Sequence, residues 1–485
     1  MPSPMRISAP SRRIALRAIA AGATLALCSC ASTSNFANAL TGYSNQARDM
    51  RQALVSGDPS HVQGELAFLD SRCRSADQIL YLSERGRIRS LSGDRAGSIA
   101  DYQIASDAFE NRRMKAVISA SETFFAASSL ASNDLAIPYD GQGFEKVMLH
   151  NLQALNYLLD GNQDFARIEL NRADVEQSYS LEAHAKLAQK AESTRRQENI
   201  DLSSSMEQLR SRTSLNSFGD ASLKNSFQNA LTFYLRGTLF EDEGSLDKAL
   251  IEYKKALDIF PANETVAESA MRVAKRVGNR REQSNIRNIS GFDAPGYEAP
   301  EGSGHVVIIF EQGFISSRST LRIPFLWDDT ILQVALPYYN VGGYPNSAAL
   351  EVTGAGINER TQGICNLDAM AIQSLKEDYP SILLRQVLRL IAKHEMQKEA
   401  DKQGFGILMQ ITNIVTDRAD DRNWLTLPAT VQVSDFFLPA GQHMLNCRYM
   451  GLSDSISIDI RENRTHYVLV TQLGQRLLIQ SGDSL

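Results

Sequence analysis

The residues with the most readily assigned chemistry stand near the N-terminus, at Cys28 and Cys30. Leu27 lies three residues before Cys30, and Ser29 is a small residue directly before it. This spacing is typical of a lipobox, in which cleavage exposes a cysteine whose thiol receives a diacylglycerol. We therefore predict lipid attachment at Cys30. Cys28 is the weaker candidate, because bulky Leu27 would then precede the cleaved bond.

Residues 1–29 have the composition of an export leader, with four arginines ahead of an apolar run over 18–27. That run is too short to cross a hydrocarbon layer of roughly 30 Å as a helix. The sequence predicts a signal peptide over 1–29 and a bacterial lipoprotein. An ordinary cleaved leader is the alternative. Arg12 and Arg13 resemble a twin-arginine signal, and Sec export stays open. Ala31, which is not Asp, favours the outer membrane, facing the periplasm.

Other sequence motifs that resemble catalytic or binding sites each lack a residue that the chemistry requires. His394-Glu395 on a predicted helix resembles a zinc motif, but Lys398 stands where the second histidine belongs. The glycines of residues 353–356 lack the third glycine of a phosphate-binding loop, and no serine-nucleophile motif occurs. We predict no catalytic residue, metal or cofactor. Distant residues can still converge in a fold, so an enzyme remains an alternative.

Charge and cysteine content limit the possible partners. The 485 residues include 50 basic and 56 acidic side chains, and removal of the leader leaves 46 and 56, a net charge of −10. This balance argues against nucleic acid, which needs clustered basic residues, so membrane attachment depends on the lipid. Cys365 and Cys447 both lie in the C-terminal region and form a possible disulfide, since export permits one. Three free buried thiols, with Cys73, are the alternative.

The chain divides by composition into an all-helical and a strand-rich part. Residues 30–45 are small and polar and predict a flexible tether. In residues 46–290, apolar residues recur at intervals of three and four positions, which indicates helices. Within them, residues 174–215 predict a long solvated helix, or alternatively a partner-binding one. A Pro- and Gly-rich linker over 291–304 follows.

A 34-residue pattern of the tetratricopeptide (TPR) kind recurs in the helical part. Each copy places a small residue where two helices cross, and a Gly at the turn. The positions are Gly237, Phe240, Gly244, Ala249, Tyr253, Ala256 and Pro261; Gly86, Gly93, Ser98, Tyr102 and Ala105; and Ala154, Tyr157, Gly161, Ala166, Leu170 and Ala173. Residues 113–147 fit poorly. The pattern predicts a TPR-like α-solenoid, with a non-repeating helical bundle as the alternative.

Residues 305–485 predict a β-sandwich-like domain with a helical insertion over 366–403. Strands are expected at residues 305–310, 321–325, 331–336, 348–352, 429–437, 443–447, 455–460, 467–472 and 476–480. Hairpin turns are expected at 439–442 and 462–464. Two helices, 366–378 and 382–402, are expected to be separated at Tyr379-Pro380. The fold class is thus multi-domain α + β.

The segment 420–428 (DDRNWLTLP) leads from the insertion back to the strands and contains Trp424, one of two tryptophans. We interpret Trp424 as a buried anchor, with Arg422 paired to a carboxylate. An exposed recognition corner is the alternative.

Residues 150–174, 232–261, 304–325 and 419–445 resemble a family of uncharacterised proteobacterial outer-membrane lipoproteins with TPR-like repeats. The resemblance implies no enzymatic activity. Relatives are encoded near lipoproteins that resemble activators of peptidoglycan synthases, which implies work in the cell envelope. The chain departs from the family in its extra cysteines.

We therefore expect a non-enzymatic, lipid-anchored protein whose helical groove captures an envelope or periplasmic protein. In the best repeat copy, the positions that resemble groove-lining ones are Leu231, Tyr234, Thr238 and Glu241. An activator of cell-wall synthesis and an envelope-polymer hydrolase with its site in the C-terminal domain are the alternatives.

Overall fold

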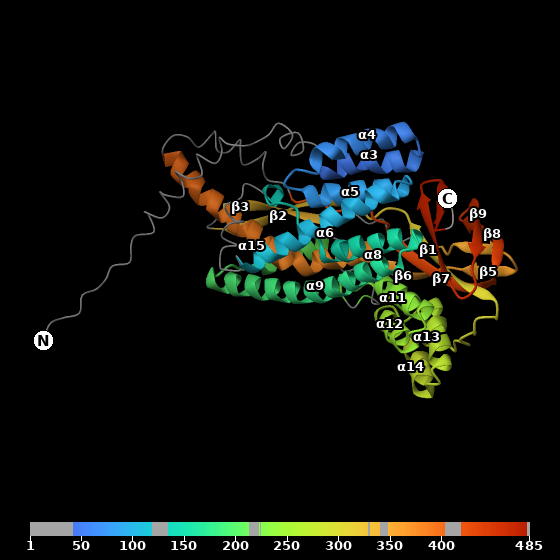
Figure 1. Ribbon diagram of the computed structural model, residues 1–485. Coiled ribbons are helices and arrows are strands. Elements are labelled where there is room, and N and C mark those ends of the chain that lie inside the picture. The colour runs from blue at the N-terminus through green and yellow to red at the C-terminus, as the bar shows by residue number, and fades with distance from the viewer. Residues whose placement is uncertain are drawn as a thin grey trace.

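The computed structural model is a mixed α/β structure with helices in its N-terminal half and most strands in its C-terminal half (Figure 1). It describes residues 42–118, 134–212, 223, 225–327, 330–339, 348–402 and 419–482. The predicted leader, Cys30 and most of the tether lie outside these residues. Within the described residues, the helix nearest the N-terminus begins at Tyr43, so the end of the predicted tether is helical. None of the described helices is both long and apolar enough to cross a membrane.

Antiparallel helix hairpins form the helical part. They are α3 (Tyr43–Ser56) with α4 (Pro59–Arg72), α5 (Gln78–Leu91) with α6 (Arg95–Ile118), α8 (Gly143–Leu159) with α9 (Gln163–Gln197), α11 (Ala230–Asp242) with α12 (Leu246–Ile259), and α13 (Glu264–Arg276) with α14 (Arg280–Ser290). A short η1 (Asp134–Ala136) precedes α8, and α10 (Ser203–Arg212) follows α9. The long helix expected over 174–215 ends earlier than predicted, because α9 stops at Gln197 and residues 203–212 form the separate α10; residues 213–215 lie outside the described residues.

Glycines allow the hairpins of the repeat pattern to close. A Cβ on Gly86 would lie 2.6 Å from the Tyr102 ring, and one on Gly237 would lie 2.4 Å from the Tyr253 ring. Both distances are shorter than real contacts, so only glycine lets these helices cross so closely. The turn residue Gly244 has a φ of 73°, in the left-handed region that glycine favours.

A five-stranded sheet, in the order β11-β10-β1-β7-β6, occupies the centre of the strand-rich part. Its strands are β1 (Ser303–Gln312), β6 (Gln362–Asn366), β7 (Thr430–Pro439), β10 (Thr465–Leu473) and β11 (Arg476–Ser481). The central β1 runs parallel to β10 and antiparallel to β7. Nearly every residue of β1 is buried, because both faces of this sheet are covered.

A four-stranded sheet, in the order β5-β4-β8-β9, covers one face of the five-stranded sheet. Its strands are β4 (Glu351–Gly354), β5 (Ile357–Arg360), β8 (Gly441–Tyr449) and β9 (Leu452–Ile460). Alternate β1 residues, such as Val306 and Ile308, belong to the core between the sheets. The intervening Val307 and Ile309 belong to a second core shared with the helices.

The two expected hairpin turns are wrong. β7 does not pair with β8, and β9 does not pair with β10. Residues 439–442 and 462–464 instead carry the chain from one sheet to the other. Hydrophobic patterning predicts most of these strands, although β5 and β6 were not expected, and it does not reveal which strand is the neighbour.

Two further expectations, both about the region near α15 (Leu367–Lys402), differ from the structure. The predicted break at Pro380 is wrong, because α15 continues through it. Buried neighbours stabilise the helix there, including Tyr379, whose hydroxyl donates to the Pro337 carbonyl oxygen at 2.7 Å. β2 (Arg318–Trp327) and β3 (Thr330–Tyr339) form a separate hairpin rather than part of either larger sheet.

The predicted linker is an ordered segment along α13. Residues 291–300 have no regular secondary structure, yet Ala294 is buried. The Gly296 amide donates to Glu268 Oε2 at 2.6 Å, and a Cβ on Gly296 would lie 2.8 Å from the Arg272 backbone nitrogen. The segment therefore runs against the helix rather than as a free connection.

Candidate functional site

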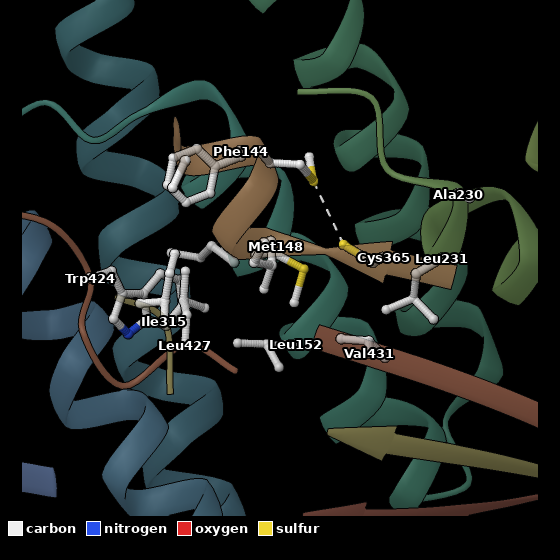
Figure 2. Close-up of a cluster of buried hydrophobic side chains, with 14 of the residues drawn as sticks. Phe144, Met148, Leu152, Ala230, Leu231, Ile315, Cys365, Trp424, Leu427 and Val431 are labelled. Carbon is white, nitrogen blue, oxygen red and sulfur yellow. Dashed lines mark hydrogen bonds between the residues drawn. The ribbon is translucent and has the colours of Figure 1, made fainter. Parts of the chain in front are cut away.

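The four residues predicted to line an open groove are all covered. Leu231, Tyr234 and Thr238 are completely buried, and the Glu241 side chain is 8% exposed. Leu231 packs beside Cys365 and Val431 in the core between the helices and the five-stranded sheet (Figure 2). The prediction of an accessible groove at these positions is therefore wrong. The face exists, but the protein's own strands cover it.

Polar contacts fix this inner face of α11 to the five-stranded sheet. The hydroxyl oxygens of Thr238 and Tyr467, on β10, lie 3.0 Å apart. Glu241 receives two hydrogen bonds from Arg272 on α13, at 2.9 and 3.1 Å. Arg272 also donates to Asp435 on β7 at 3.1 Å. One buried arginine thus links two helix hairpins to the sheet.

Asp435 is the centre of this charged cluster. His305 Nε2 lies 2.8 Å from its carboxylate, and the Ser269 hydroxyl donates to it at 2.9 Å. Burial disfavours the ionised carboxylate, but the charge of Arg272 and the bonds from His305 and Ser269 outweigh burial and lower the pKa of Asp435 to about 2. The carboxylate stays ionised because its partners enclose it, which makes it a structural link.

The segment over residues 419–428, here called the strap, lies along the inner face of α5 and α8. Glu145 on α8 accepts the Trp424 amide at 2.7 Å. Glu84 on α5 accepts the amides of Leu425 and Thr426 at 2.7 and 3.2 Å. The two carboxylates thus bind three consecutive backbone N–H groups of a segment that turns at Leu425 and Thr426.

Burial has a large effect on these two carboxylates. It raises the pKa of Glu84, although the Thr426 and Tyr43 hydroxyls and the Leu425 amide donate to the carboxylate and favour ionisation. Burial likewise raises the pKa of Glu145. A raised carboxyl pKa in a cleft can mark a catalytic acid. Here the donors come from the protein's own chain and both side chains are buried, so the arrangement holds the strap.

The interpretation of Trp424 as a buried anchor is confirmed. Its side chain is 2% exposed and meets the Tyr102 ring edge-on, with centroids 5.7 Å apart. Figure 2 shows it beside Ile315 and Leu427 in the buried cluster. Arg422 is paired with carboxylates as expected, at 2.8 Å from both Asp420 and Asp77.

The possible disulfide is wrong, because Cys365 and Cys447 are both free and buried. Cys365 lies in the core on the helical side of the five-stranded sheet, and Cys447 lies in the core between the sheets. Cys365 Sγ is 3.6 Å from Met370 Sδ (Figure 2). Burial raises the pKa of each thiol to about 12. A layer of strands separates two residues that the sequence places in one region.

An open surface lies on the outer side of the helices, between α6, α8 and α9. We call this pocket of about 510 Å³ the outer groove. Its lining residues are Ser106, Asp107, Phe109, Glu110, Arg113, Lys146, His150, Ile168, Asn171, Arg172, Val175 and Glu176. They come from the second helix of one hairpin and both helices of the next. None of them was predicted as a binding residue.

Exposed apolar side chains concentrate along the two helices that flank the outer groove. Half of the large exposed apolar residues of the described chain lie on α6 and α9, namely Ile104, Met114, Phe165, Ile168, Val175 and Leu181. Single exposed apolar residues are ordinary, but such a concentration beside a pocket is typical of an interaction site. In the sequence, the three- and seven-residue spacing of Phe165, Ile168 and Val175 was the available signal.

The charged groups on the floor of the outer groove are already paired. His150 Nδ1 lies 2.7 Å from Glu169, which also accepts from Arg172 at 2.7 Å. Arg113 pairs with Glu176 at 3.3 Å, and burial raises the pKa of Glu176. The floor is therefore polar, with its carboxylates engaged from within the protein.

A second pocket of about 620 Å³ opens at the turn between β8 and β9. Among the described residues that line it, Glu351 is the single carboxylate, and it pairs with Arg360. Glycoside hydrolysis ordinarily uses two carboxyl groups across one bond. Nor do the described residues contain a group of three His, Cys, Asp or Glu side chains placed to hold a metal ion.

No known protein-family model matches this chain, and no curated protein shows significant similarity to it. Function is therefore argued from the two helical faces.

Proposed function

We propose that this protein is a non-enzymatic lipoprotein that binds a protein of the cell envelope. In this proposal, acyl chains on Cys30 hold it at the outer membrane, facing the periplasm. The helix hairpins act as a TPR-like solenoid, and the two packed sheets act as a β-sandwich that supports it. The lipobox spacing and the repeat pattern support these assignments.

The outer groove is the observation that carries the proposal. The inner face offers nothing to a partner, because the strap and the five-stranded sheet cover it. The outer groove combines an open pocket with exposed apolar residues, such as Ile168 at 45% and Val175 at 59% exposure. We therefore assign partner binding to the outer groove in place of the four residues first expected.

A role as an activator of cell-wall synthesis is one form of this proposal, with the synthase as the bound protein. The hydrolase alternative calls for two or three clustered carboxylates or a histidine in a pocket of the C-terminal domain. The pocket beside β8 and β9 offers Glu351 alone, already paired with Arg360, so it gives the hydrolase little support.

The test is co-purification of the full-length lipoprotein from its own envelope. We expect one envelope protein to be retained in proportion to the bait, and Ile168→Glu with Val175→Glu to abolish its retention. The matched control is Ile251→Glu on α12, because Ile251 is 55% exposed but lies outside the groove. Equal retention by all three proteins would refute the groove as the binding surface.

The anchor is tested separately by metabolic labelling with a fatty acid. We expect the wild-type protein to be labelled and to sediment with outer membranes. Cys30→Ser should lose both the label and the sedimentation, while Cys28→Ser should keep both. Labelling that persists in Cys30→Ser would overturn the lipid assignment.

A further inference from the structure

The two helical faces differ in the kind of chain they can hold. On the inner face, Glu84 and Glu145 accept backbone amides of the strap, so a non-helical segment lies there with these N–H groups satisfied. An unsatisfied backbone group in a dry interface costs a large part of a hydrogen bond. Carboxylates that are free to accept therefore allow a helical surface to hold a non-helical chain.

Two carboxylates at or beneath the outer groove are occupied from within the protein. Glu169 is occupied by His150 and Arg172, and Glu176 by Arg113. The walls are helices whose backbone groups are already bonded internally. Further acceptors are the exposed side chains of Asp107, Glu110 and Asn171, and an α-helix, which bonds its own backbone groups, depends least on them.

The apolar spacing on α9 has the dimensions of a helix contact. Ile168 and Val175 line the groove. Phe165 lies outside the lining, stacked on Tyr157, and continues the same side of α9, so the three span about 15 Å at 1.5 Å rise per residue. Three turns of a docked helix present anchors at positions i, i+3 or i+4, and i+7 over a similar length. α6 runs along the opposite wall, so the groove has two helical sides.

The two walls differ in charge. The α6 wall carries the exposed carboxylate of Asp107, which accepts a hydrogen bond from Gln103, while Glu110 on the same wall pairs with Arg113. The α9 wall carries Arg172, 45% exposed, between Ile168 and Val175. A partner that matches both walls has a basic side chain toward α6 and an apolar stripe toward α9.

We propose that the outer groove binds an amphipathic α-helix of its envelope partner, with apolar residues against Ile168 and Val175 and a lysine or arginine facing Asp107. This inference rests on the proposed function and names the chemistry of the partner. The helix lies along α6 and α9 and covers the exposed part of the groove.

The experiment uses the full-length lipoprotein in its native envelope, with the photo-cross-linker benzoylphenylalanine at position 168. The same cross-linker at position 251 on α12 is the control for exposure. Mass spectrometry of the cross-linked peptide identifies the partner segment. The segment is then synthesised, and its helicity is measured by circular dichroism with and without the lipoprotein.

We expect position 168, but not 251, to capture one segment with apolar residues at helical spacing and at least one basic residue. Its helicity should rise on binding. Asp107→Lys should reduce the cross-linked yield at least fivefold. Asp258→Lys, which makes the same charge change on an exposed residue of α12, should alter the yield less than twofold.

Other outcomes separate the inference from the proposed function. A captured segment that stays extended, or a yield unchanged by Asp107→Lys, overturns the helix and leaves partner binding intact. Capture of a second copy of this chain also overturns it. Equal products at positions 168 and 251, or no product at either, refute the proposed function as well.

Discussion

The inner face and the outer groove are built from the same helix hairpins, but the protein's own strands and strap cover the inner face, whereas the outer groove is open. Arg87 and Thr238 each follow the crossing glycine of their hairpin, and both contact the five-stranded sheet. Arg87 pairs with Glu311 on β1 at 2.5 Å, and Thr238 meets Tyr467 on β10. The outer groove has no such covering among the described residues. The repeat pattern thus identifies the inner face correctly but does not reveal that the chain itself fills it.

This difference shows how a buried polar cluster can be mistaken for a site. Glu84, Glu145 and Asp435 all have shifted pKa values, which by themselves suggest function. Each has its donors within the protein and is buried. The surface suited to a partner is the one where side chains remain exposed.

The largest contrast between the faces should come from removing a side chain. Trp424→Ala leaves a cavity under the strap and should lower the free energy of unfolding by about 3–5 kcal/mol. Val175→Ala, at 59% exposure in the outer groove, should change it by less than about 0.5 kcal/mol. Urea unfolding of the full chain measures both. Equal losses would mean that the strap is not a packed element.

A smaller contrast concerns the carboxylates. Glu84→Ala strands the Leu425 and Thr426 amides and should cost about 3 kcal/mol, since each buried unsatisfied donor costs about 1–3 kcal/mol. Glu110→Ala, on the wall of the outer groove, should cost less than about 1 kcal/mol, as exposed ion pairs do. The same unfolding measurement decides between them. If Glu84→Ala lowers the free energy of unfolding only slightly, water reaches the strap and satisfies the two amides.

The junction of helices and sheet should respond to acid. The pKa of Asp435 is lowered from 3.8 to about 2, so the stability it contributes is present above its ordinary value and is lost as pH falls through about 2. That shift corresponds to about 2 kcal/mol. The difference in unfolding free energy between wild type and Asp435→Asn should therefore shrink by this amount between pH 5 and pH 2.

Ser269→Ala removes one donor to Asp435 and serves as the intermediate case, with a smaller loss over the same range. A difference that stays constant with pH would contradict the assigned linkage between Asp435 and the fold.

The smallest effect is expected from the thiols. Alkylation of the native protein should leave Cys365 and Cys447 unmodified, because burial raises both pKa values to about 12 and thiolate is the reactive form. After unfolding without reductant, both should be alkylated, as peptide mass spectrometry would show. If both cysteines instead stay protected until a reductant is added, the disulfide exists and links the two cores.

Much of the fold could be predicted locally. The crossing residues Gly86 and Gly237, the turn at Gly244 and the continuous apolar run of β1 each follow from steric or burial requirements that act within a few residues. The pairing of strands could not be predicted, because β1 joins β10 and β7 from more than a hundred residues away. Likewise, Pro380 predicts a helix end, yet the packing of Tyr379 and its neighbours outweighs the local preference.

The sequence by itself determined most of the helical and strand segments, which glycines permit close crossings, and that Trp424 is buried. It does so because these features depend on backbone freedom and on the spacing of apolar side chains. Only the tertiary structure decided that Glu84 and Glu145 bind the strap, that Leu231 and Thr238 are covered, and that Ile168 and Val175 are left open. Those outcomes depend on which distant segment excludes water from a given face, and no local pattern of residues specifies that.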